Sequence, residues 1–400
     1  MRILQIVPQI PYPLDNGARI GVFNITKYLA LRGHSITMLA LSQKEGFKPR
    51  ELEKYCHLEV ISKDTQNRVA GMFFNLFSQK PYTISKYDSL GAKQRLKEIM
   101  SQGKIDIVHV DHLHIAAYGK FLKAEWGVPI VLREHNVENT IWKRFYQLQN
   151  NPLIKAYAFF QYKKVTAYEK MMCQSFDRIL VNTKEDQERI KKLNPHIKIS
   201  IIPGGVDTSY FFPQLIEEEP YTITFVGSMD WAANIDGVLW FVEKVFPLIQ
   251  QKYPRMKLCL VGSNPVKKIN ILKSAFIDVR PNVPDVREYI AKAKVFVVPL
   301  RIGGGMRLKI LEAFAMQRAV VSTSVGCEGI EVENNRELMI ADDEHDFAQQ
   351  VVSLLSDREK RVRLGKQGYD LVKRKYSWEK VAESFEAVYE KIIQNSKPRE

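Results

Sequence analysis

VFVVPLRIGGGMRLKILEAFAMQRAVVSTSVGCEG, residues 295–329, is the stretch that decides the fold. Residues 295–300 are a short apolar run rich in β-branched side chains, which is typical of a parallel strand buried on both faces. Three glycines at 303–305 let the backbone turn sharply and lie close to a ligand. Residues 306–316 then place apolar side chains at helical spacing, and 319–323 return as another buried strand. The pattern predicts a strand, a glycine loop, a helix and a second strand.

The start of this helix predicts a binding site for an anion. Its first backbone N–H groups have no partner inside the helix, and the positive end of the helix dipole lies there. Arg307 and Lys309 add positive charge in the first turn, where cations oppose the dipole unless an anion is bound. We therefore expect phosphate groups at this loop, and sugar hydroxyls that donate hydrogen bonds to Glu312. Surface solubility is the alternative reason for the two cations.

These residues resemble the nucleotide-binding segment of retaining GT-B glycosyltransferases of family 4. The family signature is a glutamate, seven residues, a second glutamate, then Ala-Met-Ala-x-Gly-x-Pro-Val-Val, and Glu312, residues 313–315 and the pair at 320–321 match it. The place of the first glutamate, which touches the donor sugar in the family, falls on Gly304. A branch in bacterial polysaccharide assembly reads Gly-x-Gly-x-Arg-x-Lys-Ile-Leu-Glu-Ala, which residues 303–313 match throughout.

The resemblance implies an α/β GT-B fold, in which two Rossmann-like domains with parallel sheets face a central cleft. It implies a retaining hexosyltransferase that needs no metal and no cofactor besides its nucleoside-diphosphate sugar donor. The acceptor would be a hydroxyl of a glycan or a lipid-linked molecule, in cell-surface polysaccharide or glycolipid assembly. The alternatives are a nucleotide-sugar epimerase of the same fold and a non-catalytic protein that binds a nucleotide sugar or a lipid.

The boundary between the predicted domains lies near residue 203. Residues 202–213, IPGGVDTSYFFP, resemble the linker Ile-Pro-Asn-Gly-Val-Asp-x-x-x-Phe-x-Pro of the family, and glycines and prolines also suit any interdomain hinge. We predict an acceptor-binding domain over 1–203 and a nucleotide-sugar-binding domain over 204–376. The resemblance further implies a terminal helix, about 377–400, that packs back on the first domain.

A second glycine loop follows the strand predicted over 221–226. Gly227 and Ser228 can offer backbone and hydroxyl contacts to a diphosphate, and Asn234 or Asp236 is expected to cap a helix over 234–252. The arginine and lysine that commoner family members place after this strand are absent. We therefore assign diphosphate binding to Arg301, Arg307 and Lys309 of the later loop. The predicted donor-binding residues are Gly227, Ser228, Val283, Arg301, Gly303, Gly304, Gly305, Arg307, Lys309 and Glu312, with Val283 at the turn that holds the base in the family.

Polar residues follow two predicted strands of the first half, over 105–110 and 128–132. The carboxyl ends of parallel strands share one edge of a sheet, so these side chains are expected to lie together. The predicted catalytic residues are Asp111, His112 and His135, with Asp111 and His112 as an acid/base or orienting pair and His135 as a wall of the pocket. Asn16 and Gly17 are the predicted acceptor and phosphate loop; turn geometry is the alternative reason for the glycine.

Composition limits the other functions. Four scattered cysteines indicate reduced thiols in a cytoplasm rather than a metal site or disulfides, and no apolar run is long enough to span a bilayer.

Most of the net charge of +14 falls in residues 1–200. Residues 68–77 are apolar and aromatic beside basic residues, and residues 139–173, predicted as helical, mix aromatic with basic residues. These runs favour peripheral contact with an anionic membrane over nucleic acid, although core packing explains such runs more often and a solvated surface is the other alternative. We expect a cytoplasmic protein at the inner face of the cell membrane.

Overall fold

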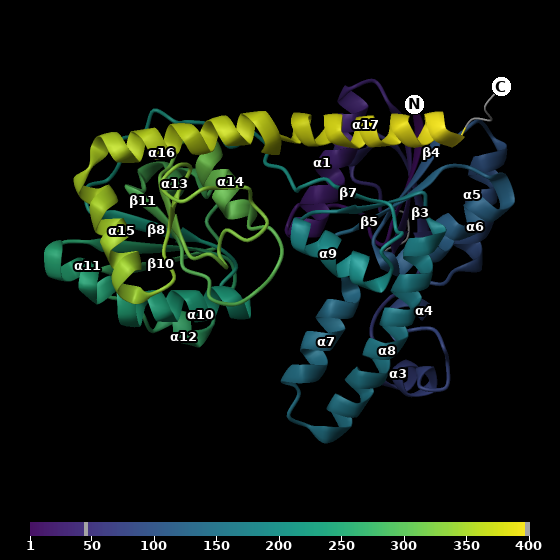
Figure 1. The fold of residues 1–400 in the computed structure, drawn as a ribbon, viewed down its shortest axis with the longest axis horizontal. Helices are drawn as coiled ribbons and strands as arrows, with labels where there is room; N and C mark the ends of the chain where they lie inside the picture. The colour runs from purple at the N-terminus through teal and green to yellow at the C-terminus, as the bar shows by residue number, and fades with distance from the viewer. Residues whose placement is uncertain (44–46, 397–400) are drawn as a thin grey trace. The chain divides into compact units, whose positions relative to one another are not determined.

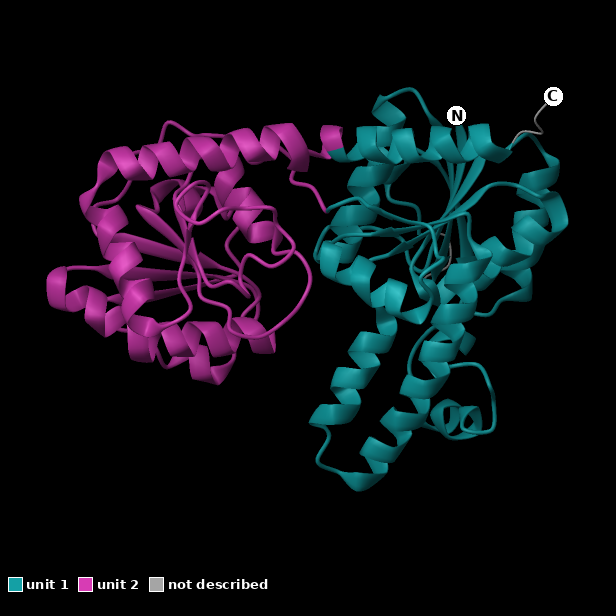
Figure 2. Ribbon diagram, in the orientation of Figure 1, with its two compact units in different colours: residues 1–203, 381–400 teal, residues 204–380 magenta. Residues whose placement is uncertain are grey.

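The computed structural model describes residues 1–43 and 47–396. The chain divides into two compact units, which Figure 2 colours separately: unit 1 comprises residues 1–203 with the described part of 381–400, and unit 2 comprises residues 204–380. Each unit contains one parallel sheet flanked by helices (Figure 1). The predicted α/β class with two parallel sheets is therefore confirmed.

The sheet of unit 1 has seven parallel strands in the order β3-β2-β1-β4-β5-β6-β7. Their bounds are β1 Arg2–Val7, β2 Ser35–Ser42, β3 His57–Ser62, β4 Ile107–Asp111, β5 Ile130–Glu134, β6 Arg178–Val181 and β7 Ile199–Ile201. The strand order reverses between β1 and β4, which pair in register from Ile3 opposite Ile107. Parallel sheets bind ligands beside such a reversal, at the carboxyl ends of the strands.

The strands β4 and β5 run further along the chain than the sequence predicts. Asp111 ends β4, and it pairs with Arg133 inside β5, so both side chains are buried within the sheet instead of following it. The carboxylate is tolerated there because Arg133 and His135 give it hydrogen bonds. The polar groups do meet at this edge of the sheet, but Asp111 and Arg133 lie inside the two strands and do not follow them.

The predicted single helix over 139–173 is two helices. Asn151 accepts hydrogen bonds from the first backbone N–H groups of α8, and Pro152 occupies the first turn, so the chain turns back after α7. The helices of unit 1 are α1 Gly17–Leu31, α2 Arg50–Glu53, α3 Val69–Asn75, α4 Tyr82–Ser85, α5 Leu90–Ser101, η1 Leu113–Ile115, α6 Ala116–Trp126, α7 Glu138–Leu148, α8 Pro152–Ser175, α9 Lys184–Leu193 and most of α17 Trp378–Ser396.

The sheet of unit 2 has six parallel strands in the order β10-β9-β8-β11-β12-β13. Their bounds are β8 Thr222–Val226, β9 Lys257–Gly262, β10 Ile277–Pro281, β11 Val295–Val298, β12 Val320–Ser322 and β13 Met339–Ile340. All four side chains of β11 are fully buried, as expected for a central strand covered on both faces. The strand order reverses between β8 and β11, which places the glycine loop after β11 at a second ligand-binding edge.

Two helix starts in unit 2 differ from prediction. The helix after β11 begins at Leu308 instead of 306, because the Arg307 side chain folds back on the loop. The helix after β8 begins at Ala232, before the predicted caps Asn234 and Asp236. The helices of this unit are α10 Ala232–Trp240, η2 Phe241–Val245, α11 Phe246–Lys252, α12 Lys267–Asn270, α13 Arg287–Lys292, α14 Leu308–Ala315, α15 Glu344–Ser356, α16 Arg358–Leu371 and η3 Val372–Tyr376.

Candidate active site

The glycine loop of unit 2 joins β11 to α14. Gly303 and Gly305 have φ of 126° and 80°, values that side-chain-bearing residues rarely adopt. A Cβ on Gly303 would lie 2.5 Å from Nη2 of Arg307. Arg307 is buried, donates from Nη1 to the carbonyl oxygens of Gly304 and Gly305, and lies 5.2 Å from the ring centroid of Trp231. The arginine therefore holds the shape of the loop.

Lys309 reaches from α14 to the end of β8. Its Nζ donates to Oδ1 of Asn234 at 3.0 Å and lies 4.2 Å from the ring centroid of Phe225. A Cβ on Gly227 would lie 2.5 Å from this Nζ, so the glycine makes room for the amine. Asn234 in turn donates to the carbonyl oxygen of Ser228 at 2.6 Å. The fold thus places the Lys309 amine beside the end of β8, where the residues that directly follow the strand include no arginine or lysine.

Lys309 and Glu312 lie one helical turn apart on α14 and titrate in the neutral range. Burial lowers the pKa of Lys309 to about 7, although the Glu312 carboxylate opposes that change. Burial also raises the pKa of Glu312 to about 7, against the attraction of Lys309. An anion bound here would draw a proton to the lysine, because a nearby negative charge favours the ammonium form.

Of the other predicted donor residues, Ser228 is joined to this cluster through Asn234, whereas Arg301 and Val283 make their contacts elsewhere in the unit. Arg301 is exposed and makes a bidentate ion pair with Asp236 on α10, at 2.6 and 3.0 Å, so its guanidinium is directed to that helix. Ser228 makes hydrogen bonds with Asp230 and, at 3.1 Å, with Ser263. Val283 follows β10 and packs half-buried against the core of unit 2. Asn234 and Asp236 do not cap α10, because they serve these contacts instead.

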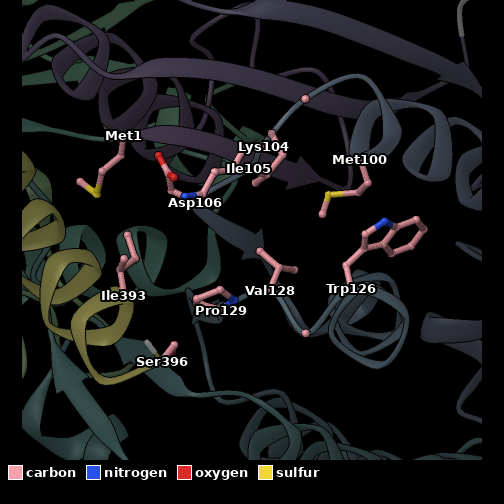
Figure 3. A pocket seen from close by; sticks show the side chains of 12 residues that line it. Met1, Met100, Lys104, Ile105, Asp106, Trp126, Val128, Pro129, Ile393 and Ser396 are labelled. Carbon is pink, nitrogen blue, oxygen red and sulfur yellow. The ribbon is translucent and has the colours of Figure 1, made fainter. Parts of the chain in front are cut away.

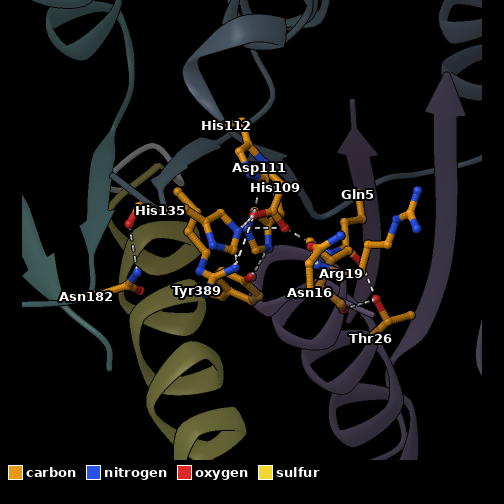
Figure 4. Close-up of polar contacts among 12 residues, drawn as sticks. Gln5, Asn16, Arg19, Thr26, His109, Asp111, His112, His135, Asn182 and Tyr389 are labelled. Atoms are coloured by element: carbon orange, nitrogen blue, oxygen red, sulfur yellow. Dashed lines mark hydrogen bonds and ion pairs between the residues drawn. The ribbon is translucent and has the colours of Figure 1, made fainter. Parts of the chain in front are cut away.

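In unit 1 a buried network surrounds Asp111 (Figure 4). Its carboxylate accepts from Gln5 Nε2 at 3.2 Å and from Arg133 Nη1 at 3.2 Å, and His135 Nε2 lies 2.9 Å from it. Gln5 accepts from the Thr26 hydroxyl at 2.7 Å, which fixes its amide. Burial alone would raise the pKa of Asp111, but His109, Arg133 and His135 together hold it well below its usual range. Asp111 is therefore a fixed negative charge.

His135 and His112 stack against each other beside this charge. Their ring centroids are 4.2 Å apart with planes 19° from parallel. His112 has φ of 81°, a strained backbone for a residue with a side chain, and such strain concentrates at functional sites. Burial lowers the pKa of His135 to about 4 and that of His112 to about 3, so both rings are neutral at pH 7. A neutral imidazole can take up a proton, and Asp111 would stabilise the cation formed.

Two family models match this chain. One described as Glycosyltransferase Family 4 matches residues 15–210, and one described as Glycosyl transferases group 1 matches residues 220–357. The chain belongs to the group 1, family 4 glycosyltransferases. The predicted family is therefore confirmed.

Relatives of this glycosyltransferase cover almost its whole length. A protein described as an uncharacterised 44.6 kDa protein in the cps region of Klebsiella pneumoniae is 23% identical over 397 residues, which are 96% of this chain and 98% of that protein. Among solved structures, sucrose-phosphate synthase of Thermosynechococcus elongatus has a TM-score of 0.71 at 17% identity, covering 98% and 99% of the two chains. HepE of Anabaena, in complex with UDP, has a TM-score of 0.68 at 11% identity, covering 98% and 100%. These likenesses show the GT-B fold.

The glycosyltransferase also holds site residues that the sequence does not reveal. His109 Nδ1 lies 2.6 Å from the Tyr389 hydroxyl, and the ring of Phe385 stacks on His109 at 5.6 Å. The centroid of the same Phe385 ring is 6.0 Å from Cζ of Arg133. Phe385 and Tyr389 lie four residues apart on α17, a spacing typical of one helix face, but nothing in sequence links that face to β4.

Asp111, His112 and His135 are close enough to hold a metal ion, with ligand atoms within 4.8 Å of one another. The guanidinium of Arg133 contradicts such a site, since its Nη1 lies 2.6 Å from His135 Nε2 and 3.2 Å from Asp111 Oδ1. A divalent cation would meet a fixed positive charge at the same atoms. This donor set therefore does not fit a metal.

The predicted acceptor loop lies at the end of β1. Asn16 caps α1 by accepting from the backbone N–H of Arg19 at 3.1 Å. A Cβ on Gly17 would meet nothing within 4 Å, and Gly17 has no positive φ, so neither packing nor turn geometry requires the glycine. A cavity of about 440 Å³ adjoins this loop, lined among others by Gln9, Tyr12 and Arg19.

A larger cavity of about 610 Å³ lies at the opposite edge of the same sheet (Figure 3). Met1, Asp106 and Pro129 line it, and they precede β1, β4 and β5. Ligands of parallel sheets bind at the carboxyl ends of strands, so this cavity is separate from the candidate active site.

Two buried carboxyl groups support the start of α7. Glu169 accepts the backbone N–H groups of Glu138 and Asn139, at 2.7 and 3.3 Å. The Glu134 carboxyl accepts from Cys173 Sγ at 3.4 Å. Burial raises the pKa of Glu169 to about 7 and, with the Glu169 charge beside it, raises that of Glu134 well above its usual range. Near neutral pH the pair holds at least one proton.

The wild-type enzyme is expected to lose stability as pH rises, and Glu134→Gln is expected to reduce that loss. A carboxyl group with a raised folded-state pKa stabilises fully below its unfolded pKa of about 4.5, and that stabilisation is lost as pH rises through the folded value. A tenfold change in acid dissociation constant on folding is worth about 1.4 kcal/mol, or about 3–6 °C in Tm for a domain of this size. Thermal melts from pH 5 to 8 measure the slope. Glu125→Gln, at an exposed site, is the control, and equal slopes for both variants would contradict the role.

Proposed function

We propose that this glycosyltransferase moves a hexose from a nucleoside-diphosphate sugar to a hydroxyl of a glycan or lipid-linked acceptor, with retention and without a metal. The observation that carries the proposal is the convergence of Lys309, Glu312 and the glycine loop at the carboxyl ends of β8 and β11. The Lys309 amine and the N–H groups at the start of α14 complement the negative charge of a diphosphate.

On the donor side, the proposed chemistry stabilises the leaving group. Negative charge develops on the nucleoside diphosphate as the sugar departs, and preorganised donors at that position lower the barrier. Lys309 supplies the charge, Arg307 fixes the loop that presents the amides, and Glu312 accepts hydrogen bonds from ribose hydroxyls. Gly227 and Ser228 contact the diphosphate, and backbone near Val283 contacts the base. The structure of HepE with UDP supports a uridine donor as the first to test.

On the acceptor side, Asp111, His112 and His135 orient the attacking hydroxyl and take up its proton. Burial lowers the pKa of both histidines, which keeps them uncharged at neutral pH, and the Asp111 carboxylate opposes this effect by stabilising the imidazolium that forms when a ring takes up a proton. The loop at Asn16 and Gly17, with its open space, admits acceptor or phosphate groups. The relative in a cps region supports polysaccharide assembly as the setting. We place the reaction at the cytoplasmic face of the cell membrane.

A thermal-shift screen of nucleotide sugars tests the proposal first. A ligand that binds only the folded state at 100 times its Kd stabilises by about 2.7 kcal/mol. We expect UDP and one UDP-sugar to raise Tm, and that sugar to be transferred to material in a lipid and glycan extract. Donor consumption without an acceptor, yielding an epimer, would overturn transfer. Absence of both a Tm change and a product with every nucleotide sugar would overturn the donor site.

A further inference from the structure

Unit 1 carries exposed apolar side chains on two neighbouring segments. The first is α3 with the two residues after it, where the exposed fractions of Phe74 and Phe77 reach 71% and 84%. The second is the hairpin of α7 and α8, where Leu148 and Leu153 at its turn reach 78% and 80%. The full set is Val69, Phe73, Phe74, Leu76, Phe77, Ile141, Phe145, Leu148, Leu153, Ile154, Phe159 and Phe160. We call it the hairpin surface.

The two segments form one surface because side chains of α8 fix α3. Lys164 Nζ donates to the carbonyl oxygen of Asn75 at 2.7 Å, and Gln161 Nε2 donates to Oδ1 of Asn75 at 3.0 Å. Gln161 also accepts from the backbone N–H of Tyr82, so it joins α8 to α4. In Figure 1 the hairpin extends away from the sheet of unit 1, and α3 lies beside α8. The apolar groups are held outside the core by satisfied polar contacts.

The charge around these apolar groups is mainly positive, although Arg68 and Lys80 make ion pairs with Asp64 and Asp88. No aspartate or glutamate occurs between Asp64 and Asp88, or between Glu138 and Glu169. The cations in the two intervals are Arg68, Lys80, Lys86, Lys143, Arg144, Lys155, Lys163 and Lys164. Lys155 and Lys163 lie 5.7 and 5.5 Å from the ring centroids of Tyr146 and Phe159, so basic and aromatic groups alternate. A surface that is apolar at its centre and mainly basic at its rim complements an anionic, amphipathic partner.

We propose that the hairpin surface docks on an anionic lipid bilayer. Its phenylalanine and leucine side chains enter the boundary between headgroups and acyl chains, and its lysines and arginines lie beside lipid phosphates. Among the described residues no helix is both long and apolar enough to cross a bilayer, so the contact is peripheral. A lipid surface explains why the apolar groups occupy a projecting hairpin, since insertion needs groups that extend beyond the rest of the unit.

The docking surface and the Asp111 network belong to the same unit. If the acceptor is lipid-linked, as proposed above, docking would raise its local concentration at the unit that receives it. The docking itself rests on the exposed side chains and their charges. A vesicle experiment therefore tests it separately from sugar transfer.

The test is flotation of the full chain with phosphatidylcholine vesicles, with and without phosphatidylglycerol. We expect flotation only with phosphatidylglycerol, and a loss when salt is raised, since screening weakens the basic contacts. Lys143→Gln with Arg144→Gln and Lys155→Gln is expected to lower partitioning about 100-fold, from the charge of three cations. Phe73→Ser with Phe74→Ser and Phe77→Ser is expected to remove binding, because the apolar anchor is lost. All six positions are exposed, so folding, checked by circular dichroism, is retained.

Matched controls lie on unit 2. Lys252→Gln with Lys267→Gln and Lys268→Gln removes three exposed cations, and Ile271→Ser with Val362→Ser removes two exposed apolar groups; neither set is expected to change flotation. A tryptophan introduced by Phe77→Trp should be quenched by brominated lipids. The proposal is overturned if the chain ignores phosphatidylglycerol at low salt, or if both unit 1 variants float like the wild type. A dimer that the phenylalanine variant dissociates, without vesicle binding, would instead assign the surface to a second copy.

Discussion

Lys309→Met is expected to lower kcat/KM for sugar transfer by about 100- to 1,000-fold, the usual cost of removing one preorganised donor to a developing negative charge. Methionine keeps the length and apolar character of the side-chain stem, while the charge beside Gly227 and its cation–π contact with Phe225 are lost. The amine is desolvated, which lowers its pKa, so its removal should leave Tm unchanged or higher. Steady-state kinetics with the donor found by thermal shift measure the effect.

The control for this variant is Lys267→Met, an exposed lysine on α12 that should behave as wild type. Calorimetry adds an independent readout. At pH 8 an amine with pKa about 7 is largely neutral, and a bound diphosphate should return its proton, so UDP binding should take up protons in the wild type and not in Lys309→Met. Identical proton uptake in both proteins would remove Lys309 from the donor site.

Asp111→Asn is expected to lower kcat by about 100- to 10,000-fold, the range of general acid–base contributions, while the Kd for UDP stays unchanged. An asparagine cannot accept from Gln5, Arg133 and His135 with the strength of a carboxylate, nor stabilise a protonated His135. It also leaves the buried Arg133 without its counter-charge, which typically costs about 3–5 kcal/mol. Single-turnover kinetics at saturating donor isolate the chemical step.

A second variant keeps this prediction testable if Asp111→Asn unfolds. His112→Gly removes the imidazole that stacks on His135 and relieves the positive φ, so the backbone gains rather than loses stability. Transfer should slow while Tm and donor affinity are maintained. His57→Gln, an exposed histidine on β3, is the surface control. Wild-type turnover in His112→Gly would exclude the ring from the reaction.

The local geometry of the donor loop is predictable from sequence, and its long-range contacts are not. Buried β11, the left-handed glycines 303 and 305 and the amphipathic α14 each follow from neighbouring residues. That Lys309 crosses to Gly227 follows only from the parallel pairing of β8 and β11. The helix start at Leu308 instead of 306 depends on Arg307 folding back on its own loop, a side-chain choice that periodicity does not encode.

The acceptor side shows the same limit. The sequence predicts that Asp111, His112 and His135 gather because they follow two strands, and the sheet does gather them. Arg133 and Glu134 follow one another in β5, yet one joins the Asp111 network and the other the carboxyl pair below α7, because successive side chains of a strand face opposite sides. Asn151 and Pro152 are typical of a helix start and could have predicted the break between α7 and α8. The aromatic residues continue across both helices, which favoured the prediction of a single helix.

Unit 1 is discontinuous along the chain, because most of α17 belongs to it and contacts β4 through the hydrogen bond between Tyr389 and His109. Residues 204–380 must be synthesised before Phe385 and Tyr389 can reach β4. Unit 1 therefore cannot complete its folding until all of unit 2 has been synthesised. A fragment ending near 203 would expose His109 and the face of Arg133 to water. Any attempt to isolate unit 1 should therefore keep residues 381–396, and an internal deletion of residues 204–380 that joins β7 to α17 through a short linker is the appropriate design.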